Sequence, residues 1–127
     1  MQLAYTILYV QDVPATLDFY QKAFGFEQKM LHESGDYGEL ETGQTTLSFS
    51  SLSLMEELGK KPSSPQKNHP SFEIAFTTDN VPKAFDHALK SGAQPVQEPA
   101  EMPWGQTTAY VSDLNGFLVE ICTPIKI

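Results

Sequence analysis

Two stretches of the sequence follow the same pattern sixty-eight positions apart, and this repeat constrains the fold more than any other feature. Asp12–Pro14 aligns with Asn80–Pro82. The same shift pairs the following residues: Thr6 with Ile74, Leu8 with Phe76, Asp18 with Asp86 and Lys22 with Lys90. A unit that cannot bury its own sheet face alone is expected to pair with a copy of itself. The sequence therefore predicts two copies of one structural unit.

Hydrophobic periodicity predicts the order βαβββ in each copy. In the first copy the expected strands are Leu3–Val10, Phe26–Glu33, Tyr37–Glu41 and Thr45–Ser50, with a helix capped by Asp12 and ended by Gly25. In the second copy they are Ser71–Thr78, Gln94–Glu98, Gln106–Ser112 and Phe117–Cys122, with a helix that runs from the cap Asn80 to Gly92.

A segment without apolar periodicity separates the two copies. Residues 59–70 contain three prolines and read as a linker. We therefore expect an α+β fold in which modules 1–58 and 71–127 form one domain over residues 1–127. If the mixed sheet of such a pair of βαβββ modules is curved, it encloses a cup.

The charge balance excludes several classes of partner. Eight Lys and Arg residues stand against sixteen Asp and Glu residues, which gives a formal net charge of −8. This surplus disfavours nucleic acid and anionic membranes and favours a cationic ligand. The segment Met1–Val10 lacks the basic start of a signal peptide, so a cytoplasmic location is expected. The lone cysteine, Cys122, follows an apolar run and is expected to be a buried, unreactive thiol.

Strand alternation places several polar and aromatic side chains on the sheet faces turned away from the helices. The repeat makes Tyr5 equivalent to Glu73, and the later strands match Ser48 with Glu120. On a curled sheet these four side chains would line one cup. Four more residues have the parity to join them: Tyr9, Tyr37, Thr108 and Tyr110. If Glu39 and Glu41 share the face of Tyr37, they too would favour a cationic ligand.

Two segments carry a resemblance to a known family: Val10–Phe26 in the first copy and Asp113–Ile121 at the end of the second. With Met102–Gly105 added, the whole chain resembles the glyoxalase/bleomycin-resistance/extradiol-dioxygenase superfamily, the vicinal oxygen chelate proteins, and in particular its bleomycin-resistance-like branch. The resemblance implies paired βαβββ modules around an open cup, usually in a homodimer.

In metal-dependent members of that superfamily the cup holds a divalent ion. The ligands come from the first, fourth, fifth and eighth strands, which here correspond to Tyr5, Ser48, Glu73 and Glu120. Glu120 keeps the family pattern and Glu73 is a possible ligand, whereas Tyr5 and Ser48 depart from it. Because a tight site needs about three protein ligands, we expect no cofactor, although Glu73 and Glu120 are able to hold a divalent ion loosely.

The roles of the candidate residues admit alternatives. Glu73 and Glu120 are either a catalytic acid/base pair or the polar floor of the cup. Trp104 either stacks on a ligand at the cup mouth or packs its own turn. Tyr5, Tyr9, Tyr37, Ser48 and Tyr110 either contact a ligand or only pack the sheet. The histidines His32, His69 and His87 share no motif with one another and carry no predicted role.

Three functions fit the sequence. The first is a metal-independent protein that binds and sequesters a cationic or aromatic small molecule, as in antibiotic resistance. The second is a lyase, isomerase or dioxygenase of the same superfamily that uses a divalent ion held by Glu73 and Glu120. The third is an interaction or sensor domain that uses the fold without chemistry, because a fold alone does not define a function.

Overall fold

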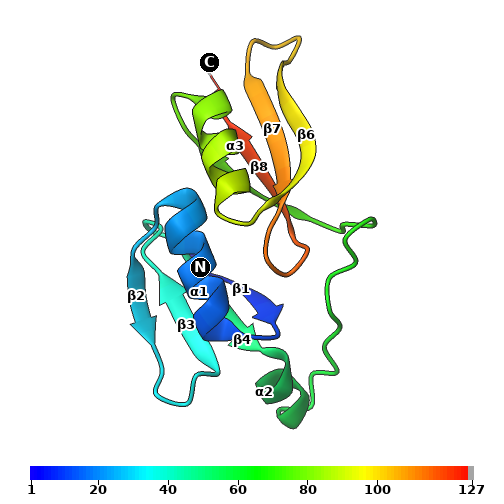
Figure 1. The fold of residues 1–127 in the computed structure, drawn as a ribbon. Coiled ribbons are helices and arrows are strands. Elements are labelled where there is room, and N and C mark those ends of the chain that lie inside the picture. Colours follow the sequence, from blue (N-terminus) through cyan, green and yellow to red (C-terminus); the bar gives the residue numbers. More distant parts are fainter. Residues whose placement is uncertain (126–127) are drawn as a thin grey trace. The chain divides into compact units, whose positions relative to one another are not determined.

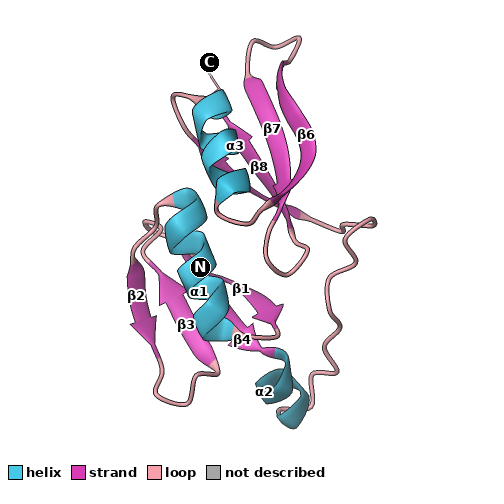
Figure 2. Ribbon diagram, in the orientation of Figure 1, coloured by secondary structure: helices cyan, strands magenta, loops and turns pink. Residues whose placement is uncertain are grey.

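The computed structural model describes residues 1–125, and these fall into two compact units (Figure 1). The first unit is Met1–Ser64, and the second begins at Pro65. The division between them lies inside the segment 59–70, which the sequence predicts to be a linker. Among the described residues between α2 (Leu52–Glu57) and β5 (Glu73–Thr77) there is neither helix nor strand (Figure 2).

The first unit is a four-stranded mixed sheet with one long helix. Its elements in chain order are β1 (Tyr5–Val10), α1 (Val13–Phe24), β2 (Gln28–Leu31), β3 (Tyr37–Leu40), β4 (Thr46–Ser51) and the short α2. The strand order is β1-β4-β3-β2. β1 and β4 are parallel, and the other neighbouring pairs are antiparallel.

The second unit repeats this topology. It contains β5, α3 (Val81–Lys90), β6 (Gln94–Glu101), β7 (Thr107–Ser112) and β8 (Leu118–Cys122), with the strand order β5-β8-β7-β6. β5 and β8 are parallel, as β1 and β4 are. The predicted α+β fold of two βαβββ modules is therefore confirmed.

The registers show that the repeat extends to single residues. Ile7 pairs with Ser48 across β1 and β4, and Ala75 pairs with Glu120 across β5 and β8. Sixty-eight positions separate Ile7 from Ala75, which is the shift seen in the sequence, whereas seventy-two separate Ser48 from Glu120. The difference arises because the segments between the helix and the last strand differ in length in the two modules.

The predicted helix starts are confirmed. The Oδ1 atom of Asp12 accepts a hydrogen bond from the amide of Ala15 (3.0 Å), and Oδ1 of Asn80 accepts one from the amide of Lys83 (3.2 Å). These side chains satisfy amides that have no partner within the helix. Gly25 ends α1 in the left-handed conformation, with φ of 80°, which glycine adopts without strain.

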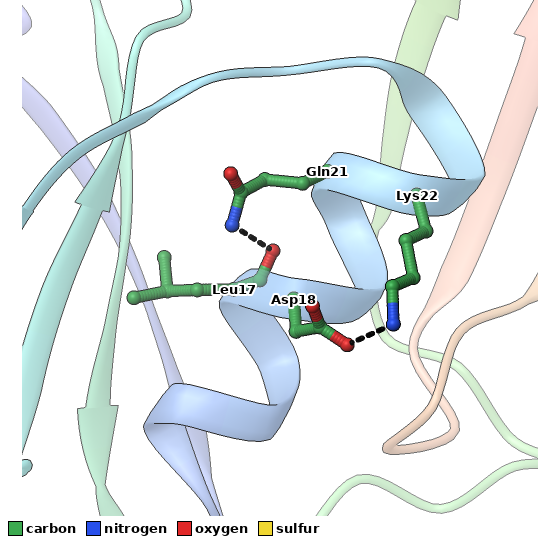
Figure 3. A network of polar contacts seen from close by, with 4 residues as sticks. All are labelled: Leu17, Asp18, Gln21 and Lys22. Atoms are coloured by element: carbon green, nitrogen blue, oxygen red, sulfur yellow. Dashed lines mark hydrogen bonds and ion pairs between the residues drawn. The ribbon is translucent and has the colours of Figure 1, made fainter.

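Matching ion pairs lie on the exposed surfaces of the two long helices. Lys22 Nζ lies 2.9 Å from Asp18 Oδ2, and Lys90 Nζ lies 3.0 Å from Asp86 Oδ2. Figure 3 shows the first pair beside the amide of Gln21, which donates to the Leu17 carbonyl (3.4 Å). Both ion pairs are well exposed, so they add little stability.

In the first unit the core lies between α1 and one face of the sheet. Leu17 of α1 packs so closely on Gly38 of β3 that there is no room for a side chain at that position. A Cβ atom on Gly38 would lie 2.5 Å from Leu17 Cδ1. The ring of Tyr20 packs against that of Phe49, with centroids 5.1 Å apart. Buried apolar residues of this core include Leu8, Val10, Val13, Leu17, Tyr20, Leu40, Leu47 and Phe49.

The core of the second unit uses the equivalent face. Its buried apolar residues include Val81, Phe85, Ala88, Ala109, Val111, Val119 and Ile121. The alternation along β5 would place Phe72 on the core face with Ile74 and Phe76, but Phe72 is 46% exposed because it precedes the strand. Its ring packs edge-on against Phe117, with centroids 5.8 Å apart.

Candidate functional site on the sheet faces

In each unit the helix covers one sheet face, and the polar candidate residues lie on the other. In the second unit, Glu73 alternates with the core-facing Ile74, and Glu120 lies between the buried Val119 and Ile121. Tyr110 lies between Ala109 and Val111, which are also buried. Three neighbouring strands, β5, β8 and β7, therefore bring Glu73, Glu120 and Tyr110 to one face.

Tyr110 and Glu120 are direct cross-strand partners. The Tyr110 hydroxyl donates a hydrogen bond to Glu120 Oε2 at 3.2 Å. On the other side of β8, Glu120 pairs with Ala75, whose small side chain leaves space on this face. Glu73 lies two residues from Ala75 on the same strand face. We call these three residues, Glu73, Tyr110 and Glu120, the carboxylate pair and its tyrosine.

The electrostatics of this group favour protonated forms. Desolvation raises the pKa of Glu73 above its ordinary value, although much of the residue is exposed, and the charge and hydrogen bonding of Glu120 raise it further. Burial, followed by the charges of Glu120 and Glu73, raises the pKa of Tyr110 to about 12. Like charges close together resist joint ionisation, so the face would gain stability from a bound cation.

The lone cysteine lies next to this group. Cys122 is 4% exposed, as the sequence predicts, and its Sγ donates to the Phe76 carbonyl at 3.7 Å. Burial, and then the charges of Glu120 and Glu73, raise the pKa of its thiol. A thiol with a raised pKa is a poor nucleophile, which agrees with the predicted structural role.

The first unit carries a related group on β1, β4 and β3. Ser48 is the cross-strand partner of Glu39 and of Ile7, and it is completely buried. The hydroxyl of Tyr37 donates to Glu39 Oε2 at 2.7 Å. Tyr5 is 52% exposed and lies close enough to influence the pKa of Tyr37. From the sequence, Glu39 is expected on this face only if it shares the face of Tyr37. In the structure its carboxylate accepts the hydrogen bond of the Tyr37 hydroxyl.

Burial is the main reason that the pKa of Tyr37 is raised, while Ser48 opposes part of the rise and Glu39 adds to it. Within residues 1–125, the buried Thr108 hydroxyl of the second unit has no hydrogen-bond partner. Tyr9, half-buried, lies on the same strand face as Tyr5 and pairs with Ser50.

Trp104 lies apart from these strand residues, in the turn between β6 and β7. It is 64% exposed. Its indole Nε1 donates to Gln106 Oε1 at 2.8 Å, and Gln106 Nε2 donates to the Thr123 carbonyl at 2.7 Å. Trp104 borders an open pocket of about 380 Å³ whose lining also includes Asp79, Gln106, Thr107, Thr123 and Pro124.

Gln106 and Asp79, which line this pocket, were not predicted from the sequence. Gln106 lies two residues after Trp104, and this spacing is the only sequence signal that points to it. No sequence signal identifies Asp79, because only folding brings the β5–α3 connection next to the start of β7 and the end of β8.

The donor set does not match a tightly bound metal ion. Of the four positions at which the superfamily places ligands, Tyr5 and Ser48 supply neither a carboxylate nor an imidazole. Within residues 1–125 no three His, Cys, Asp or Glu side chains gather closely enough to hold an ion. Two carboxylates remain, which suit only a hard cation that keeps most of its water. That all four positions line one cup stays a prediction.

The fold and these faces define a class: two-module α+β proteins that present polar groups on open sheet faces. Comparison with known proteins identifies the family. The sequence model of the Glyoxalase/Bleomycin resistance protein/Dioxygenase superfamily matches residues 2–121, so the chain belongs to this superfamily. No helix in the described part of the chain has the length and apolar character needed to cross a membrane.

Individual relatives are distant. The uncharacterized protein YraH of Bacillus subtilis (strain 168) is 24% identical over 124 residues, which cover 95% of this chain and 97% of YraH. A glyoxalase-related enzyme from Fulvimarina pelagi matches with a TM-score of 0.83 at 21% identity, covering 98% of this chain and 88% of that one.

A glyoxalase/bleomycin resistance protein/dioxygenase family enzyme from Burkholderia phytofirmans PsJN also has a TM-score of 0.83, at 23% identity, covering 97% of this chain and 98% of the other. At these identities the structural matches establish the fold and leave the activity open.

Proposed function

We propose that the protein binds a small organic cation with an aromatic part, without the help of a metal ion. The observation that carries this proposal is the carboxylate pair and its tyrosine. Glu73 and Glu120 lie on adjacent strands of one face, and desolvation followed by the charge of Glu120 raises the pKa of Glu73. A bound cation would relieve this repulsion, whereas an anion would increase it.

The same electrostatics predict how binding depends on pH. A cation binds best when both carboxyl groups are ionised. Because the pKa of Glu73 is raised, its ionisation is completed at a higher pH than that of an ordinary glutamate. We therefore expect the affinity to increase as the pH rises through the pKa of Glu73, and to level off above it.

Trp104 supports the aromatic part of the proposal. The relay from its indole to Gln106 and on to the Thr123 carbonyl fixes the plane of an exposed ring. A ring that is already oriented loses little side-chain entropy when a flat ligand stacks on it. Asp79 in the same pocket adds negative charge beside the ring.

Fluorescence titration with proflavine, a flat aromatic cation, tests the proposal. We expect saturable binding that Glu120→Gln and Trp104→Ala each weaken at least fivefold. Glu98→Gln is the matched control, because it removes the same charge from an exposed position of the second unit. Equal binding of the dianion fluorescein, or unchanged proflavine affinity in both Glu120→Gln and Trp104→Ala, would refute the proposal.

A second candidate function follows from membership in the superfamily and from the same carboxylate pair. It is a lyase, isomerase or dioxygenase in which Glu73 and Glu120 hold a divalent ion. Metal analysis of protein purified without chelator, with Mn²⁺, Zn²⁺ and Ni²⁺ titrated into the wild type and Glu120→Gln, separates the two. Stoichiometric metal that is lost in the variant supports the enzyme. The homodimer that the family resemblance implies stays a prediction.

A further inference from the structure

The turn that connects β7 to β8 contains the pair Asn115-Gly116, which neither proposed function uses. Asparagine followed by glycine is especially prone to spontaneous deamidation. Glycine has no Cβ atom to hinder its own amide nitrogen when that nitrogen attacks the asparagine side chain. The turn is also open to water, because Leu114 is 51% exposed and the two residues after it are half-buried. The reaction is therefore chemically possible here, and the conformation of the turn decides whether it proceeds.

Deamidation would join the two residues into a succinimide ring. The Gly116 nitrogen loses its proton and attacks Cγ of Asn115, which forms a new N–C bond. The bond from Cγ to Nδ2 of Asn115 breaks, and ammonia leaves with the proton. Water then opens the ring at either carbonyl and yields aspartate or isoaspartate. The reaction consumes only water and needs no oxidant or reductant.

In the folded unit the Gly116 nitrogen is held away from this attack. Its N–H donates to the Asp113 carbonyl at 3.2 Å, which closes a turn over four residues. A hydrogen-bonded amide retains its proton and directs its nitrogen toward the acceptor. Lys67 also lies against the turn, since a Cβ atom on Gly116 would be 3.7 Å from Lys67 Cβ. The turn therefore has little room to rearrange while it stays closed.

The Asp113 side chain fixes the residues on both sides of Gly116. Its Oδ1 accepts hydrogen bonds from the amides of Asn115 and Phe117, both at 2.8 Å. The amide of Asp113 donates in turn to the Phe117 carbonyl at 2.9 Å, and Asp113 is only 4% exposed. Hydrogen bonds to a carboxylate are stronger than those between neutral groups. Asn115 therefore cannot rotate toward the Gly116 nitrogen unless these bonds break and the turn opens.

We propose that Asn115 is a deamidation site that Asp113 protects, so that conversion of Asn115 to isoaspartate marks opening of the β7–β8 turn. This inference goes beyond the proposed function, because none of its residues belongs to the carboxylate pair and its tyrosine or to the pocket beside Trp104. Failure of proflavine to bind would therefore leave it standing.

Peptide mapping by mass spectrometry follows Asn115 in the full chain at mildly alkaline pH. We expect conversion in the native protein to be at least about tenfold slower than in guanidinium chloride, because only the open turn reacts. Asn68 and Asn80 are internal controls. The side chains of His69 and Val81 follow them and hinder attack, so both should convert far more slowly than Asn115 in the unfolded chain. Equal rates at Asn115 in the native and unfolded states would overturn the proposal.

Variants assign the protection to Asp113. Asp113→Ala removes both side-chain hydrogen bonds and should speed the conversion of Asn115 in native protein at least about fivefold. Asp113→Asn keeps an acceptor oxygen in the same place and should retain most of the protection. Asp12→Ala is the matched control, because it removes a carboxylate that caps a backbone amide in the first unit, and it should change the rate less than twofold.

The comparison of native with unfolded wild type needs no variant, so the proposal is tested even if Asp113→Ala does not fold. An unchanged rate at Asn115 in Asp113→Ala protein with a native circular dichroism spectrum would refute the protecting role of Asp113.

Discussion

The contact between Tyr110 and Glu120 gives the sharpest test of the second unit's site. The pKa of Tyr110 is raised to about 12, first by burial and then by the charge of Glu120, whose Oε2 lies 3.2 Å from the tyrosine hydroxyl. Glu120→Gln removes this charge but keeps the shape of the side chain and its acceptor oxygen. The burial of Tyr110 stays the same, so the variant isolates the effect of the charge.

The distance sets the magnitude. Two unit charges 3.2 Å apart repel by about 1 kcal/mol in water-like surroundings, which is the appropriate limit for a half-exposed pair. Since about 1.4 kcal/mol corresponds to one pKa unit, Glu120→Gln should lower the pKa of Tyr110 by about one. Tyr110 should still ionise later than an ordinary tyrosine, because desolvation is the larger cause.

The raised pKa also makes stability depend on pH. The protonated tyrosine is favoured in the folded state, so its contribution is complete below pH 10, the ordinary pKa. The contribution is lost as the pH rises from 10 through about 12. Loss of the Glu120 charge should make this alkaline loss smaller, because the folded-state pKa of Tyr110 then lies closer to its ordinary value.

Spectrophotometric titration of tyrosinate provides the assay. The chain has five tyrosines, so Tyr110→Phe, measured in parallel in the wild type and in Glu120→Gln, isolates the one late ionisation by difference. Glu98→Gln serves as the charge-matched control. If Tyr110 ionises at the same pH in wild-type and Glu120→Gln protein, the two side chains are not in contact, and the argument for the carboxylate pair and its tyrosine fails.

Two further predictions concern packing and reactivity. Gly38→Ala should destabilise the protein by about 1–3 kcal/mol in urea unfolding, because its Cβ would lie 2.5 Å from Leu17 Cδ1; unchanged stability would contradict the close approach of α1. The thiol of Cys122, whose pKa is raised by burial and by the charges of Glu120 and Glu73, should react with iodoacetamide far more slowly in the native protein than in urea. Equal rates in the two states would show that the thiol is accessible.

Much of the fold follows from the sequence repeat and from local signals along it. Cap residues such as Asp12 and Asn80 and the left-handed Gly25 act within a few residues of their own position, so a local pattern is enough to place them. Alternation likewise placed Glu73, Glu120 and Tyr110 on one kind of face. Ends of strands were less predictable: Phe72 has the right parity, yet it lies outside β5 because pairing with β8 begins only at Glu73.

Short-range periodicity is enough to predict the two βαβββ modules, their helix boundaries and the parity of the candidate residues. Which of those residues touch depends on the folded arrangement of the strands. Strand register pairs Tyr110 with Glu120 and Ser48 with Glu39, and the meeting of three chain segments forms the pocket beside Trp104. Register depends on hydrogen bonding between strands that lie far apart in sequence, so parity alone cannot specify it.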